Sequence, residues 1–275
     1  MKRLVLFLMA MGLGAAYCSA SQAAPIDSFD GPVAIGPTQA PGVWYTDRYA
    51  PAGFVGGQVA PDGRTGTLQQ SISAADFNRP APYNSVFYNT QGRKFDTPGL
   101  TSAFIEMYIP GSWDALNQSV TGSEGRLGGF WATGADVNNA ATATTIFPVI
   151  EFNNLVDGFR VFDPEAGGTG YQNVSGFAGF DRWYEIGFQI NGSDIEYFVN
   201  GMLVYTDSTI GTTTQFNNII LQGYNAGNAY SIYWDNFQAD SAMVPEPASL
   251  AIWSLIGVAG AAGAWRRKRK LSSAS

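Results

Sequence analysis

The feature that most constrains the fold is an alternation of apolar and polar residues with a period of two, which recurs along the middle of the chain. In residues 104–109, Ile105, Met107 and Ile109 share one face, and a Pro-Gly pair ends the run. A period of two places successive side chains on opposite faces of a strand. No stretch of the middle shows a sustained helical period of 3.6 residues. We therefore predict a middle built from β-strands.

The clearest strand pattern covers residues 183–205. A polar turn at 191–194 separates two alternating runs, and Asn200-Gly201 follows the second of them. Asn-Gly suits a type I′ turn, because both central residues of that turn take positive φ. The turn predicts two facing pairs across a hairpin: Val199 with Met202, and Tyr197 with Val204.

Further strands are predicted wherever alternating runs are bounded by Gly, Asn, Asp or Pro. These runs are residues 126–133, 146–152, 159–162, 219–224 and 231–239. About ten or more strands without crossover helices indicate two packed antiparallel sheets. We expect one all-β domain over residues 24–243, an antiparallel two-sheet β-sandwich.

The first 23 residues predict a secretory signal peptide. Lys2 and Arg3 precede an apolar run at 4–16 that is too short to span a bilayer comfortably, and small residues lie before Ala24. The alternative is an uncleaved anchor helix. Cleavage would make the Sec translocon and signal peptidase partners of the chain, in an export route across the inner membrane of a Gram-negative bacterium.

Residues 244–275 form a tail in three parts. Val-Pro-Glu-Pro at 244–247 is followed by an uncharged stretch at 248–265, which as a helix is about 27 Å long and just spans the hydrocarbon. The basic end of the tail comprises Arg266, Arg267, Lys268, Arg269 and Lys270. Under the positive-inside rule this cluster is a cytoplasmic stop for a single transmembrane helix. A plain tail anchor would explain the helix alone.

Pro245, Glu246 and Pro247, followed by the apolar helix and the basic cluster, resemble the PEP-CTERM sorting signal. The two prolines also hold the segment extended, which suits binding by a protease. The resemblance implies processing by exosortase, a membrane protease and transpeptidase, which releases or attaches the protein outside the cell. It implies an inner-membrane-tethered intermediate and then a cell-surface or extracellular protein, commonly in bacteria that make exopolysaccharide.

Charge and the scarcity of reactive side chains exclude several functions. Residues 24–243 hold 8 basic and 21 acidic residues, a net charge of −13, which repels nucleic acid. The chain has no histidine, and its one cysteine, Cys18, lies in the leader. Catalysis that relies on histidine is thereby excluded. We expect no cofactor and no metal, although loop oxygens of Asp136, Asn138 and Asn139, or of Asp157 and Asp163, suit calcium.

A second resemblance concerns the fold of the middle. Residues 183–188, 197–201 and 233–237 are similar to the late strands of concanavalin A-like (laminin G-like) jelly rolls, and residues 26–30 are similar to their first strand. The resemblance implies that the opening strand pairs with the last one. These motifs reflect core packing and a turn, so they indicate a fold and not a site.

Glycoside hydrolases on this fold use two carboxylates, often arranged as Glu-x-Asp-x-x-Glu on one strand. The nearest match begins at Glu151, but Asn153 replaces the aspartate and no second glutamate follows. A hydrolase would need a partner from another strand. A lone strand glutamate is usually solvated. The sequence thus favours a protein that is not an enzyme.

A carbohydrate-binding role is the favoured interpretation. Aromatic rings stack on sugars, and Asn and Glu bond to hydroxyl groups. Such side chains gather on one predicted sheet: Trp113, Trp131, Glu151, Asn153 and Asn154. We predict an exported surface or matrix protein that binds or structures extracellular polysaccharide. The alternatives are a glycoside hydrolase or lyase, and a purely structural surface protein.

Overall fold

The computed structural model describes residues 26–78, 89–119, 124–136, 138 and 144–241. The predicted signal peptide, the sorting motif, the apolar helix at 248–265 and the basic cluster therefore lie outside the described residues. Within the described ranges, no helix is long and apolar enough to cross a membrane.

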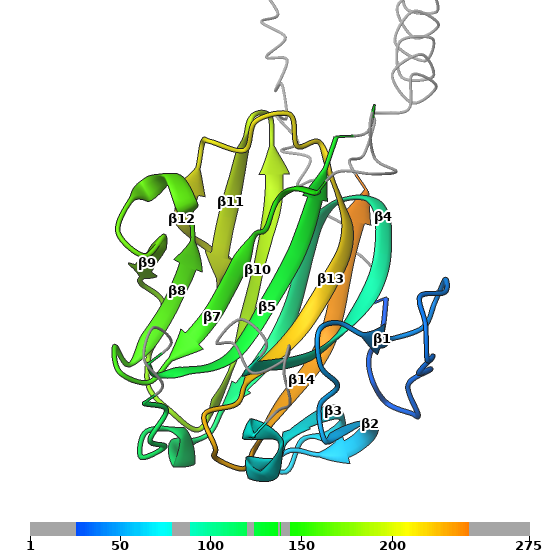
Figure 1. Cartoon of the computed structure of the whole chain (residues 1–275), viewed down its shortest axis with the longest axis vertical. Coiled ribbons are helices and arrows are strands. Elements are labelled where there is room, and N and C mark those ends of the chain that lie inside the picture. The colour runs from blue at the N-terminus through cyan, green and yellow to red at the C-terminus, as the bar shows by residue number, and fades with distance from the viewer. Residues whose placement is uncertain (1–25, 79–88, 120–123, 137, 139–143, 242–275) are drawn as a thin grey trace, which may run out of the picture.

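The described residues form strands and three short 3-10 helices (Figure 1). The strands are β1 (Tyr45–Thr46), β2 (Gly53–Val59), β3 (Thr65–Ile72), β4 (Thr90–Ile109), β5 (Arg126–Ala135), β6 (Thr144–Ile146), β7 (Val149–Asn153), β8 (Gly158–Phe162), β9 (Tyr171–Val174), β10 (Arg182–Asn191), β11 (Asp194–Val199), β12 (Met202–Asp207), β13 (Gln215–Tyr224) and β14 (Tyr230–Ser241). The 3-10 helices are η1 (Ala74–Phe77), η3 (Gly111–Trp113) and η5 (Pro164–Ala166).

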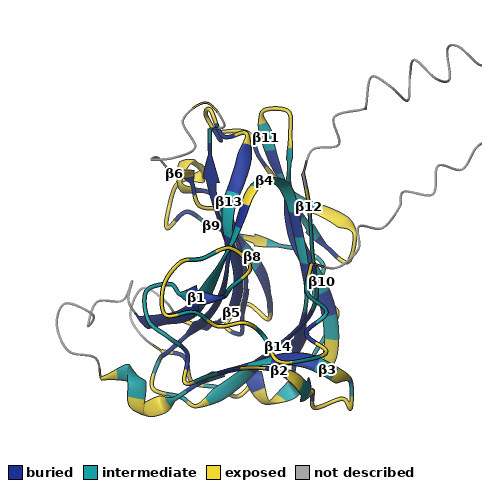
Figure 2. Ribbon diagram, turned by 90° about the vertical axis from the view of Figure 1, so that its right-hand side faces the viewer, coloured by how far each residue is buried: buried dark blue, intermediate teal, exposed yellow. Residues whose placement is uncertain are grey.

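The strands pair into two layers that share the long strand β4. Sheet A contains β1, the first part of β4, β13, β5, β7, β8 and β9, with β6 beside β5. Sheet B contains β12, β11, β10, the second part of β4, β14, β3 and β2. Figure 2 shows the layers from the side, with β13 and β5 in one and β10 and β12 in the other. Every pairing between named strands is antiparallel, so the predicted all-β antiparallel sandwich is confirmed.

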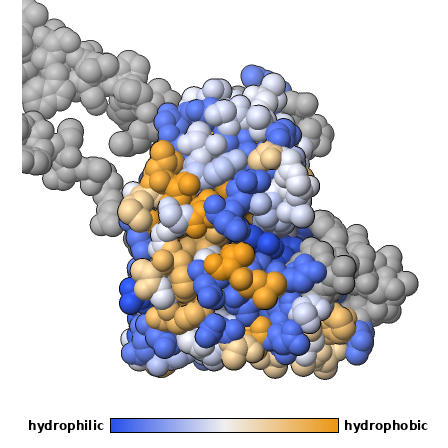
Figure 3. Space-filling model, turned by 90° about the vertical axis from the view of Figure 1, so that its left-hand side faces the viewer, coloured by the Kyte–Doolittle hydropathy of each residue, from blue (hydrophilic) through white to orange (hydrophobic). Residues whose placement is uncertain are grey.

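The core lies between the two sheets. Ile105, Met107 and Ile109, the predicted apolar face, are each 0% exposed. Aromatic rings join the layers, since Phe130 of β5 stacks on Phe188 of β10 with centroids 5.0 Å apart. Burial of such side chains is the main stabilising contribution to a fold of this kind. Figure 3 shows the face on the side of β9 and β12, where apolar patches lie among polar residues.

The predicted hairpin is confirmed in part. Asn200 and Gly201 both take positive φ, 49° and 71°, and Val199 faces Met202 as expected. The predicted pairing of Tyr197 with Val204 is wrong. A β-bulge next to Tyr197 shifts the register, and Tyr197 faces Tyr205 instead.

The other predicted strands are also found, with one interruption. The run at 146–152 is divided, because β6 ends at Ile146 and β7 begins at Val149, with Pro148 between them. Proline lacks the backbone N–H that a continuous ladder needs. The predicted pairing of the opening residues with the last strand occurs as one bridge, between Asp27 and Phe237.

Candidate functional site

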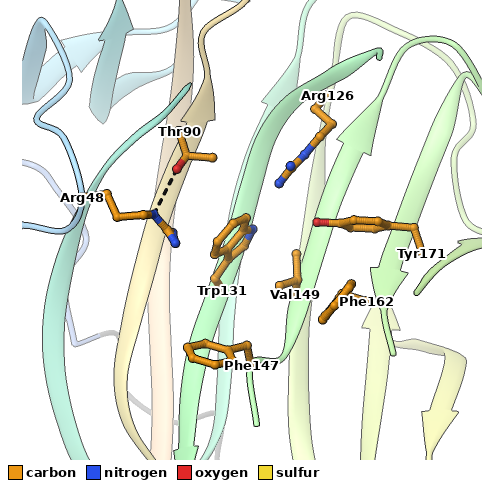
Figure 4. Close-up of a pocket in the computed structure, with 8 residues that line it drawn as sticks. All are labelled: Arg48, Thr90, Arg126, Trp131, Phe147, Val149, Phe162 and Tyr171. Carbon is orange, nitrogen blue, oxygen red and sulfur yellow. Dashed lines mark hydrogen bonds between the residues drawn. The ribbon is translucent and has the colours of Figure 1, made fainter. Parts of the chain in front are cut away.

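The outer face of sheet A, away from the core, carries a pocket of about 310 Å³. Its lining comes from five strands and two connecting segments (Figure 4). The lining residues are Arg48, Thr90, Arg126, Trp131, Phe147, Val149, Phe162 and Tyr171. This volume lies at the lower end of small-molecule sites, roughly 300–1,000 Å³.

Strand register explains why these side chains meet. Trp131 of β5 lies between Ile220 of β13 and Val149 of β7, and these three form a small apolar cluster separate from the main core. Phe162 and Tyr171 face each other on β8 and β9 and pack against that cluster. Residues at facing positions on neighbouring strands project from the same side of a sheet. Strand residues therefore supply most of the pocket lining.

Glu151 anchors one side of the pocket through two arginines. Its Oε2 accepts hydrogen bonds from Nη2 and Nε of Arg126, at 3.0 and 3.2 Å. Its Oε1 accepts from Nε and Nη2 of Arg160, each at 2.8 Å. The expectation of a solvated glutamate is wrong, because Glu151 is 3% exposed. Charge-assisted bonds to both oxygens offset the cost of burying the carboxylate.

The charge of Arg126 is maintained by the same contact. Burial works against the guanidinium charge and is the largest single effect, but the Glu151 carboxylate, together with Tyr171 and Tyr224, outweighs it and raises the Arg126 pKa. The Arg126 guanidinium also lies over three rings, with its carbon 5.7, 5.4 and 5.2 Å from the centroids of Trp131, Tyr171 and Tyr224. These contacts fix a permanent cation in the pocket wall.

Asp47 anchors the opposite side in a similar way. Its carboxylate lies 2.8 Å from Nη2 of Arg48 and 3.0 Å from Nζ of Lys94, and it accepts from Nε2 of Gln222 at 2.7 Å. Nε of Arg48 donates to Thr90 Oγ1 at 3.1 Å, which Figure 4 shows as a dashed line. Two carboxylates thus hold four cations, of which Arg48 and Arg126 line the pocket.

Trp131 and Tyr171 supply polar atoms to the pocket. The indole Nε1 of Trp131 is buried and has no acceptor among the described residues. Figure 4 shows that nitrogen on the side of the ring that faces the Tyr171 hydroxyl. Burial raises the pKa of Tyr171 to about 12, and Glu151 adds to this effect, so the phenol keeps its proton at neutral pH. The pocket therefore presents donors for a ligand's oxygen atoms.

The structure brings two of the five predicted site residues to this place. Trp131 lines the pocket, and Glu151 lies behind Arg126. Trp113 is 1% exposed and packs in the core against Phe152 and Tyr230. A fully buried ring offers no face to a sugar, so Trp113 is not brought to the pocket.

Asn153 and Asn154 serve the loop after β7. Nδ2 of Asn153 donates to the Glu124 carbonyl, and its Oδ1 accepts from the Leu155 amide. Nδ2 of Asn154 donates to the carbonyls of Trp113 and Leu116, both at 2.8 Å. Both amides thus hold backbone in place, and neither lines the pocket.

Sequence reasoning did not identify most of the pocket. Arg48, Arg126, Phe147, Phe162 and Tyr171 were not predicted as site residues. One local signal was present in β5, where Gly129 lies two residues before Trp131. A Cβ at Gly129 would lie 2.8 Å from Trp131 Nε1, so the indole ring occupies the space that this glycine leaves open.

The loop carboxylates make other contacts. Oδ1 of Asp136 accepts from the amide of Asn138, and Asp163 caps η5 and accepts from the Tyr205 hydroxyl. Among the described residues, no three His, Cys, Asp or Glu side chains are grouped so as to hold a metal ion.

Carboxylates are absent from the described residues that line the pocket. Glycoside hydrolysis needs two of them, one on each side of the scissile bond. The nearest along the sheet are Asp47 and Glu151, and each binds two cations. Aromatic walls, guanidinium groups and an indole donor suit a ligand that has apolar ring faces and many oxygen atoms.

Comparison with known proteins gives a likeness of structure only. No family model matches the chain, and no curated protein matches it. Among solved structures, the Rhodothermus marinus laminarinase matches with a TM-score of 0.48 and 11% identity, over 79% of this chain and 98% of that one. The Bacillus licheniformis β-glucanase matches with a TM-score of 0.39 and 14% identity, over 74% and 94%.

A third match is the carbohydrate-binding module CBM66 from Bacillus subtilis, with a TM-score of 0.36 and 11% identity, over 72% of this chain and 95% of that one. Glycan-cleaving enzymes predominate among the named matches. This finding contradicts the expectation that the chain is not an enzyme, and we withdraw that expectation. Because these TM-scores lie below 0.5, the likeness does not by itself assign a function to the pocket.

Proposed function

We propose that the pocket on sheet A binds a sugar unit of an extracellular polysaccharide. The observation that carries this proposal is the indole Nε1 of Trp131, a buried donor that has no acceptor among the described residues and lines an aromatic pocket. A buried donor without a partner costs about 1–3 kcal/mol. A sugar hydroxyl that accepts from this nitrogen would recover that cost on binding.

The rings around the donor supply the apolar part of the site. Phe147 is 52% exposed and lines the pocket, while Phe162 and Tyr171 contact each other beside it. Aromatic faces bind the C–H faces of sugars, and donors nearby fix the orientation of the hydroxyl groups. The pocket combines both kinds of group (Figure 4).

Binding is tested with the full chain, purified in mild detergent, on a glycan array and on the polysaccharide of the producing bacterium. We expect retention of the chain, and we expect Phe147→Ala to weaken binding about three- to tenfold through loss of ring contact. Leu155→Ala is the matched control, because Leu155 is an exposed apolar residue outside the pocket lining. Absence of retention on every glycan would overturn the proposal.

A second candidate function is glycan cleavage on the same outer face of sheet A. The observation that favours it is the placement of two acids on either side of one strand pair. Gln222 bonds to Asp47 and faces Gly129, which in turn faces Glu151 on β7. The test is release of reducing ends from the bound polysaccharide. Loss of that activity in both Glu151→Gln and Asp47→Asn would support cleavage. Full activity in either variant would contradict this second candidate function.

We further propose that the chain is exported and then processed at its tail. The signal peptide pattern at 1–23 and the PEP-CTERM-like tail at 244–275 support this proposal. Signal peptidase and an exosortase-type protease are then its processing partners. Mass spectrometry of the surface fraction should find a mature form that begins at Ala24 and lacks both the apolar stretch and the basic cluster of the tail. Finding only the uncut chain in the cytoplasmic fraction would contradict this route.

A further inference from the structure

The charge of the pocket is opposite to that of the domain around it. The middle of the chain carries a net charge of −13, yet the pocket lining includes two guanidinium groups, Arg48 and Arg126, and no carboxylate among its described residues. Four of the eight basic residues of the middle belong to the Asp47 and Glu151 networks. Such a concentration in an acidic domain indicates a local field directed at an anion.

The carboxylates in these networks do not cancel the cations. Asp47 is shared by Arg48 and Lys94, and Glu151 is shared by Arg126 and Arg160. The six charged side chains therefore leave an excess of two positive charges. Because Arg48 and Arg126 are mostly buried, with side-chain exposures of 13% and 11%, solvent screens that excess less than it would at an open surface.

The two guanidinium groups lie around the same ring. The carbon of the Arg48 guanidinium is 4.7 Å from the Trp131 ring centroid, and that of Arg126 is 5.7 Å away. Figure 4 shows Arg48 and Arg126 on different sides of Trp131. A ligand that accepts from the indole nitrogen would thus have its substituents within the field of both cations.

We infer that the ligand is an anionic polysaccharide whose sugars carry a carboxylate or sulfate group, and that Arg48 and Arg126 select for this charge. The inference rests on the proposed sugar-binding function of the pocket and narrows its ligand class. Guanidinium groups bind both anions through charge-assisted hydrogen bonds. The acidic remainder of the domain repels polyanions, so binding of one must occur at this face.

The test measures affinity of the full chain for polygalacturonate, dextran sulfate and neutral dextran by calorimetry. We expect at least one anionic polymer to bind about tenfold or more tightly than dextran. Added salt should weaken this binding, because the Debye length falls from about 10 Å at 0.1 M to about 3 Å at 1 M. Comparison of the two anionic polymers identifies whether carboxylate or sulfate is the preferred source of charge.

Substitutions connect the charge preference to the pocket. Arg48→Gln should weaken binding of the anionic polymer about tenfold, and Arg48→Lys should restore part of it. Arg182→Gln is the matched control, because Arg182 is an exposed cation on β10 of sheet B and should leave affinity unchanged. Thermal melting of each variant verifies the fold.

The possible outcomes separate the two proposals. In one outcome, dextran and the anionic polymers bind equally, Arg48→Gln has no effect, and Trp131→Phe abolishes binding. This result would overturn the charge inference but would support sugar binding. If the chain binds none of these polymers and no other glycan, both the sugar-binding proposal and the charge inference are overturned. Equal weakening by Arg48→Gln and Arg182→Gln would also overturn the inference, because the attraction would then be non-specific.

Discussion

Trp131 on sheet A and Trp183 on sheet B both lie beneath an arginine, yet their indole nitrogens differ. Nε1 of Trp183 donates to Asp62 at 2.7 Å, while the Arg64 guanidinium carbon lies 3.9 Å from the ring centroid. Nε1 of Trp131 has no acceptor among the described residues. One tryptophan completes a surface cluster, whereas the other leaves a donor available to a ligand.

The two faces differ in charge as well. On sheet B, Glu106 faces Glu185 on β10 and Asp235 on β14, and Arg64 bonds to Glu106 and Asp235. Acids there outnumber the cation that holds them, while on sheet A the cations outnumber the acids. The comparison shows that a tryptophan with arginine and acidic neighbours does not by itself define a site. Sheet A is distinguished by its pocket and by the buried Nε1 of Trp131, which has no acceptor among the described residues.

The largest expected effect is on stability and concerns the buried network. Glu151→Ala should lower the free energy of unfolding by about 3–5 kcal/mol, because it leaves Arg126 and Arg160 without their shared carboxylate. Glu106→Ala on sheet B should cost about 1 kcal/mol or less, since its ion pair is more exposed. Urea denaturation measures both. Similar losses in the two variants would contradict the assigned difference between the faces.

The next effect is on binding. Trp131→Phe keeps an aromatic ring and removes the indole donor, so affinity for the polysaccharide should fall about tenfold. Trp183→Phe should change affinity less than about twofold, because its nitrogen already binds Asp62. Calorimetry with the same polymer compares the two variants. A larger loss in Trp183→Phe would place the ligand on sheet B.

The smallest expected effect is the pH dependence of stability contributed by sheet B. Burial raises the pKa of Glu185, and Glu106 adds to the rise; burial also raises the pKa of Asp235. The folded state thus holds protons that the unfolded state has lost. This stabilising contribution is fully present below the ordinary pKa values, and it is lost as pH rises through the raised ones.

Glu185→Gln should therefore make the decline of the melting temperature with rising pH less steep in the acid range. The measurement is a series of thermal melts of the wild-type chain and the variant, from about pH 4 to about pH 7. Identical slopes in the two proteins would show that this carboxyl group holds no additional proton in the folded state.

Much of the fold was predictable because its signals are local. The alternation at Ile105, Met107 and Ile109 fixes which face of β4 is buried, and the Asn200-Gly201 pair fixes a turn. The register beyond that turn was not predictable. The bulge beside Tyr197 depends on pairing across the sheet, and a period of two does not reveal where an extra residue is inserted.

The pocket was less predictable because its contacts join distant parts of the chain. Asp47 meets Gln222 across 175 positions, and Glu151 meets Arg126 across 25. A sequence pattern shows that Glu151 stands alone on its strand, but it does not show which cations meet it there. The sequence does not distinguish the environments of Trp131 and Trp113. The packing of the sheets places Trp131 in the pocket lining and Trp113 in the core.

The most direct test of the central claim is an NMR experiment on the indole N–H signals of the full chain, which has seven tryptophans. The Trp131 signal is identified by its absence in Trp131→Phe. Titration with the polysaccharide that binds in the affinity tests should shift this signal, because a ligand oxygen then accepts a hydrogen bond from Nε1. The Trp183 signal should stay in place. A shift of the Trp183 signal with no change at Trp131 would contradict the account.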